Sequence, residues 1–112
     1  MLYIKNQWFL GKGKSFRSIK PLTGEIFWKG NFANQSQLNT AMNAAHKSHD
    51  GWSAESIKTR IKIIRKFYAL LEKNKLPMTN LISTETGKTI TDAASEVAAT
   101  LAKLNNSILA HK

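Results

Sequence analysis

A glycine- and lysine-rich segment, GKGKS from Gly11 to Ser15, holds residue types that could bind a phosphate. Glycines let a backbone approach an anion closely, and Gly-Lys-Ser ends the phosphate-binding P-loop. That motif needs another glycine five positions before its second one, where this chain has Trp8. The dinucleotide fingerprint also fails, because Phe16 occupies its third glycine position and no helix is expected to begin there. We therefore interpret the segment as a hairpin turn.

Three histidines could in principle contribute to a metal site. His46 and His49 are three residues apart on a predicted helix and are followed by Asp50. A metal site needs a third or fourth ligand, and none follows at a suitable spacing. We interpret this pair as exposed surface histidines, and His111 has no evident base or nucleophile as a partner.

Groups for nucleophilic or acid–base catalysis are scarce. The chain has no cysteine, which removes disulfides, thiolate metal ligands and cysteine nucleophiles. Its one cluster of carboxylates comprises Glu85, Asp92 and Glu96. The last two fall early in a predicted helix, where negative charge complements the helix dipole. We predict no catalytic, cofactor-binding or metal-binding residue within this chain.

A strong basic bias marks the composition, with 17 Lys and Arg against 7 Asp and Glu and a net charge of +10. Such a bias can favour binding to nucleic acid or to an anionic membrane. Five cations lie largely off the apolar stripe of one predicted helix: Lys58, Lys62, Arg65, Lys66 and Lys73. Four aromatic residues on the predicted strands could stack on bases: Tyr3, Trp8, Phe16 and Trp28.

A solvated lysine-rich face is the interpretation we favour for these cations. The sequence holds no recognised nucleic-acid motif and only three arginines, the residue that bidentate base recognition prefers. We expect neither nucleic acid nor a membrane as partner. A basic binding module for nucleic acid or another acidic surface is the alternative.

Short strands are expected in the opening third of the chain. Residues 2–9 and 25–29 have strand composition, and residues 15–20 can form a further short strand. Residues 21–24, Pro-Leu-Thr-Gly, are typical of a turn, since proline fixes φ early and glycine accepts a positive φ near its end. We expect a small antiparallel unit over about residues 2–30.

Helices are expected over about residues 35–110. Asn34 and Gln37 match a capping box, and Asp50-Gly51 is expected to end the helix that follows. Ser53 is expected to cap a second helix at 54–74. The apolar positions of the first helix are Leu38, Ala41, Met42 and Ala45. Those of the second are Ile57, Ile61, Ile64, Tyr68 and Leu71, widened by Phe67 and Leu70.

Two further helices complete the predicted elements. Pro77 can begin a third helix, which Gly87 ends, and Thr89 with Asp92 is expected to cap a fourth. The fourth runs without a Gly or Pro stop toward Lys112. Its apolar residues repeat at three- and four-residue steps: Ile90, Ala94, Val97, Leu101, Leu104 and Ile108. Few strands are left to cover this face, so we expect the chain to stop partway through a larger architecture.

A set of stretches carries a resemblance to a known family. They are Tyr3 to Trp8, Pro21 to Ile26, Ala44-Ala45 with Trp52, Arg60 to Asn74, and Glu85 to Lys88 followed by Ala93 to Val97. In this order and spacing they resemble the N-terminal region of the aldehyde dehydrogenase superfamily. A resemblance to its succinylglutamic semialdehyde dehydrogenases, enzymes of arginine catabolism, rests on Trp28 to Asn31 and on Lys103 with Ser107 to His111.

The resemblance implies an α/β fold of which residues 1–112 are the N-terminal part of the cofactor-binding domain: short antiparallel strands followed by about four helices. In such enzymes a cysteine thiolate attacks the aldehyde, hydride passes to NAD or NADP, and a glutamate activates water. The family's nucleotide loop, glutamate and cysteine all lie beyond the position where this sequence ends. We therefore expect the 112-residue chain to bind no cofactor and to be inactive alone.

The resemblance also implies partners, because family enzymes are homo-oligomers. We expect the rest of a dehydrogenase subunit, or an intact homologue, to be the partner of this chain. The opening residues lack the features of a secretory signal peptide, which favours a cytoplasmic location.

Overall fold

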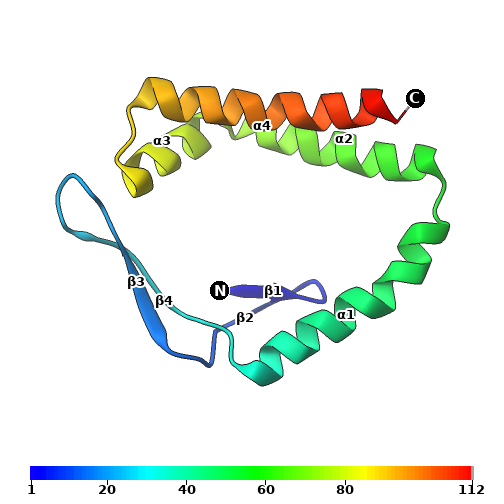
Figure 1. The fold of residues 1–112 in the computed structure, drawn as a ribbon, viewed down its shortest axis with the longest axis horizontal. Coiled ribbons are helices and arrows are strands. Elements are labelled where there is room, and N and C mark those ends of the chain that lie inside the picture. Colours follow the sequence, from blue (N-terminus) through cyan, green and yellow to red (C-terminus); the bar gives the residue numbers. More distant parts are fainter. Residues whose placement is uncertain (112) are drawn as a thin grey trace. The chain divides into compact units, whose positions relative to one another are not determined.

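The computed structural model describes residues 1–111, which divide into two compact units. One unit contains residues 1–19 and 25–55, and the other contains residues 20–24 and 56–111. The first holds all four strands and helix α1, and the second holds helices α2, α3 and α4 (Figure 1). The expected order, short strands followed by four helices, is confirmed.

A tight hairpin opens the first unit. Strands β1 (Leu2–Ile4) and β2 (Gln7–Phe9) pair in antiparallel fashion through a two-residue turn. In that turn Lys5 has a φ of 51° and Asn6 a φ of 61°, the backbone that a type I′ hairpin turn requires. The predicted single strand over residues 2–9 is therefore wrong. The chain reverses because both turn residues adopt the left-handed conformation.

A second hairpin forms a separate two-stranded sheet. Strands β3 (Ser15–Ile19) and β4 (Ile26–Asn31) are antiparallel, with Phe16 opposite Gly30. This confirms the strands expected at 15–20 and 25–29, although the opening third holds two small sheets instead of one unit.

The turn predicted at residues 21–24 is present. Gly24 has a φ of 70°, a left-handed value that glycine adopts without strain. Its N–H donates to the carbonyl oxygen of Lys20 at 2.9 Å.

Helix α1 (Gln35–Ala54) begins at the predicted capping box. The Gln37 N–H donates to Asn34 Oδ1 at 2.9 Å, and the Asn34 N–H donates to Gln37 Oε1 at 3.2 Å. The predicted end at Asp50-Gly51 is wrong, because the helix continues through Gly51 to Ala54. A glycine ends a helix only where it turns left-handed, and Gly51 stays helical.

Helix α2 (Ile57–Lys73) begins three residues later than the sequence predicts. Ser56, and not Ser53, is its N-cap, and the Ser56 hydroxyl accepts from the Thr59 N–H at 3.1 Å. Ser53 instead lies in the last turn of α1, where its hydroxyl donates to the Asp50 carbonyl at 3.0 Å.

Helix α3 (Lys75–Thr86) begins two residues before Pro77, which lies in its first turn, where a missing N–H costs no helical bond. Gly87 ends it in the left-handed conformation, as predicted. Helix α4 (Ile90–Ala110) is capped by Thr89, as predicted. The expected extension into Lys112 lies outside the described residues.

The core of the second unit forms along one side of α4, which runs alongside α2 and α3 (Figure 1). Its buried apolar side chains are Ala93, Val97, Leu101 and Ile108. Ala93 takes the place that the sequence pattern assigned to Ala94, whereas Ile90 is exposed. In the first unit, Ile4 is the buried apolar residue among those described.

Both units leave many large apolar side chains exposed. No residue of α1 or α2 is fully buried. On α2, Phe67 and Leu70, predicted to widen the buried stripe, are exposed, whereas Ile61, Ile64, Tyr68 and Leu71 are half-buried. None of the helices within residues 1–111 combines the length and apolar character needed to cross a bilayer.

Candidate functional site

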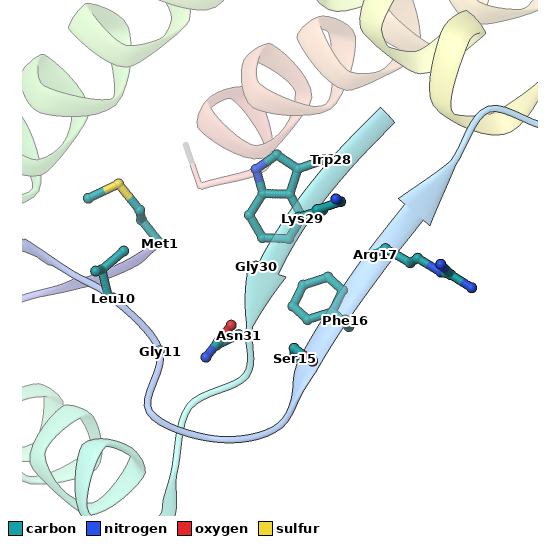
Figure 2. A pocket seen from close by; sticks show the side chains of 10 residues that line it. All are labelled: Met1, Leu10, Gly11, Ser15, Phe16, Arg17, Trp28, Lys29, Gly30 and Asn31. Atoms are coloured by element: carbon teal, nitrogen blue, oxygen red, sulfur yellow. The ribbon is translucent and has the colours of Figure 1, made fainter. Parts of the chain in front are cut away.

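A hollow of about 740 Å³ lies on the β3–β4 hairpin. Figure 2 shows its lining, which consists of Met1, Leu10, Gly11, Ser15, Phe16, Arg17, Trp28, Lys29, Gly30 and Asn31. The Phe16 ring lies 4.9 Å from the Trp28 ring and is stacked 4.3 Å from that of Phe32. These aromatic contacts join β3 to β4 and to the residue that follows β4.

Two cations flank this aromatic cluster. Arg17 and Lys29 are directly opposite one another in the antiparallel register, and the Arg17 side chain extends away from the rings (Figure 2). The lining holds no carboxylate, histidine or thiol. The hollow can therefore contact an apolar or anionic group, but it offers no nucleophile paired with a base.

The glycine-rich segment between β2 and β3 packs against the chain that follows β4. The Gly13 N–H donates to the Phe32 carbonyl at 2.8 Å, and the Lys12 N–H donates to Gln37 Oε1 at 2.9 Å. A Cβ on Gly11 would lie 2.1 Å from the Asn31 carbonyl oxygen, so close backbone packing requires glycine there. Its predicted role as a hairpin turn is wrong, since it links two separate sheets.

These contacts also bear on dinucleotide binding. A phosphate cradle needs backbone N–H groups that point at the ligand from a loop opening a helix. Here the N–H groups of Lys12 and Gly13 already bond within the chain, and the segment leads into strand β3. The segment does not fit a dinucleotide pyrophosphate.

Four side chains that were candidate site residues lie on a helix surface, in a helix cap or in an ion pair. His46 and His49 are exposed on α1, and no group of three potential metal ligands occurs within residues 1–111. Asp92 accepts a hydrogen bond from the Thr89 hydroxyl at 2.9 Å and belongs to the α4 cap. Glu96 forms an ion pair with Lys88.

The aromatic hollow is the feature that the sequence pattern did not predict as a site. The sequence signals for it are Phe16 and Trp28, which the sequence pattern identifies only as separate aromatic residues able to stack. Recognising the cluster requires the β3–β4 register, which places residues 12 positions apart on neighbouring strands.

Comparison with known proteins identifies the fold to which these elements belong. The sequence profile of the aldehyde dehydrogenase family matches residues 8–110. The chain belongs to the aldehyde dehydrogenase family.

Similar family members include the N-succinylglutamate 5-semialdehyde dehydrogenase of Salmonella schwarzengrund, which is 40% identical over 110 residues. The protein of that name from Pseudomonas fluorescens is 32% identical over 111 residues. The alignments cover 98% and 99% of this chain but 22% and 23% of the relatives. The chain thus spans about a quarter of an aldehyde dehydrogenase of this kind.

Solved aldehyde dehydrogenase structures share the fold described above. The NAD-dependent benzaldehyde dehydrogenase of Corynebacterium glutamicum matches 95% of this chain with 23% of its own, at a TM-score of 0.90 and 23% identity. The succinate-semialdehyde dehydrogenase of Burkholderia pseudomallei matches 88% of this chain with 21% of its own, at a TM-score of 0.82 and 26% identity. The matched part is the N-terminal region of these enzymes.

Proposed function

We propose that this aldehyde dehydrogenase chain is the N-terminal part of an NAD(P)-dependent enzyme that oxidises N-succinylglutamate 5-semialdehyde to the acid. The proposed substrate rests on the 40% identity, over 98% of the chain, to a protein named for that aldehyde. The cofactor class rests on family structures described as NAD-dependent and NADP-dependent.

The chemistry of this reaction must come from the part of the enzyme that this chain does not contain. Family enzymes use a thiolate nucleophile, and the chain has no cysteine. The segment that most resembles a phosphate loop uses its amides within the chain. The described residues therefore supply scaffold, and the 112-residue chain is inactive without the remaining polypeptide.

The exposed apolar surface supports the proposal that a partner covers it. A stable isolated domain buries most of its large apolar side chains, whereas here few are buried and many are exposed. On α2 the exposed residues include Ile63, Phe67 and Leu70. The proposed cover is the rest of the dehydrogenase subunit, or an intact homologue in a shared oligomer.

A chimeric enzyme tests this proposal. The 110-residue stretch of the Salmonella schwarzengrund enzyme that this chain matches is replaced by the matching residues of this chain. The chimera is expected to oxidise N-succinylglutamate 5-semialdehyde with a kcat/KM within about tenfold of the parent, a change of about 1.4 kcal/mol in activation free energy. The reason is that the replaced part provides scaffold and leaves the reacting groups in place.

The measurement is formation of NADH or NADPH, with the parent enzyme as control. A chimera that fails to assemble would contradict the proposed structural role. A chimera that assembles but no longer oxidises the succinylated aldehyde would contradict the proposal that this chain belongs to an enzyme acting on it.

A further inference from the structure

We propose that one side of α2 binds the phosphate backbone of a nucleic acid, irrespective of base sequence, which is the alternative to the solvated lysine-rich face that the sequence alone favours. The site is the cationic stripe, defined as Lys58, Lys62, Arg65 and Lys66. These four side chains, with Ile61 and Ala69, line a hollow of about 580 Å³. With 3.6 residues per helical turn, the four positions fall within an arc of roughly 100° around the helix.

The charges of the cationic stripe are not neutralised within the chain. All four side chains are exposed, and no carboxylate in the described part of the chain forms an ion pair with them. The one acidic residue of α2 is Glu72, about two turns beyond Arg65. Like charges one turn apart repel one another, and a bound polyanion would relieve that repulsion.

Packing of α2 leaves the stripe accessible. The half-buried residues Ile64, Tyr68 and Leu71 lie on a different side of the helix from the cations. The exposed apolar residues Ile63, Phe67 and Leu70 lie on a third side, so a polypeptide covering them would not need to cover the stripe. The inference therefore goes beyond the dehydrogenase function proposed above.

The shape and spacing of the stripe favour a chain-like anion. Lys58, Lys62 and Lys66 follow one another at intervals of about 6 Å along the helix axis, so they present a regular row of charge. The hollow is shallow and open, because all six residues that line it belong to α2, so a strand lying along the helix could contact the cations. Lysines act as point charges that hold phosphates without reading bases.

The test measures binding of the full 112-residue chain to a fluorescent duplex DNA of arbitrary sequence. If the stripe neutralises four phosphates, log K falls with log salt concentration with a slope of about −3.6. Binding should then weaken about 150-fold between 50 and 200 mM salt. Replacing the stripe with glutamine (K58Q, K62Q, R65Q, K66Q) should weaken binding at low salt at least about tenfold and flatten the slope.

A matched control removes four charges elsewhere through K12Q, K47Q, K75Q and K103Q, all at exposed positions. This control should change affinity less than about threefold, and both variants should keep the helical circular dichroism of the parent. Equal weakening by the two variants would overturn the proposal, because net charge alone would then explain binding. Binding to phosphatidylserine vesicles in preference to DNA would also overturn it, in favour of a lipid surface.

Discussion

Val97→Asp is expected to unfold the three-helix unit of this aldehyde dehydrogenase chain. Val97 is 2% exposed at the centre of the α4 core, among the buried apolar side chains of Ala93 and Leu101. An unpaired buried ion costs several kcal/mol, and a whole small domain is stable by about 5–15 kcal/mol. Because only four apolar side chains of α4 are buried, we expect the free energy of unfolding of this unit to be small. The measurement is helical circular dichroism during urea titration.

Ala98→Asp provides the matched control for that substitution. Ala98 is the next residue of α4 and is exposed, so the change adds the same charge to the same helix without burying it. We expect a loss below about 1 kcal/mol for Ala98→Asp, mainly from helix propensity. Equal urea midpoints for the two variants would show that the α4 core does not hold this unit together.

Replacing Ile63, Phe67 and Leu70 with glutamine is expected to weaken self-association of the isolated chain about a hundredfold. These side chains are 47%, 52% and 62% exposed on one side of α2. Apolar side chains gain about 1.5–3 kcal/mol each on full burial, so partial burial of three in a contact between copies gives about 3 kcal/mol. The association constant is measured by analytical ultracentrifugation.

The control for this apolar strip places three glutamines on another side of the same helix through K58Q, K62Q and K66Q. Those changes keep the apolar strip, so the chain should associate at least as strongly as the parent. If the apolar replacements leave association unchanged while the lysine replacements abolish it, the exposed apolar side chains are not the surface that needs a cover.

Local signals predicted the elements that depend on residues close in sequence. The capping box of Asn34 and Gln37, the turn ending at Gly24 and the left-handed Gly87 each follow from the chemistry of one or two side chains. The first hairpin was missed because its turn, Lys5-Asn6, lacks the glycine that usually marks left-handed backbone. Ser53 and Ser56 are equally good caps, and only the end of α1 at Ala54 distinguishes them.

Burial was harder to predict than helix position. A run of apolar residues such as Phe67 and Leu70 shows where a helix has an apolar side, but not which part of it a neighbouring helix covers. The aromatic hollow on β3–β4 was missed for a similar reason, because it depends on strand register. The lack of a thiol, by contrast, followed from composition alone. Chemistry that needs a particular atom can be excluded without any knowledge of the fold.

The assay of the purified 112-residue chain with N-succinylglutamate 5-semialdehyde and either NAD or NADP tests the central claim most directly. Before the assay, the preparation is treated with a thiol-alkylating reagent, which inactivates contaminating aldehyde dehydrogenases at their catalytic thiol and finds no thiol to alkylate in this chain. We predict no formation of NADH or NADPH above the protein-free rate at any chain concentration. An alkylation-resistant rate that rises in proportion to chain concentration would contradict the claim.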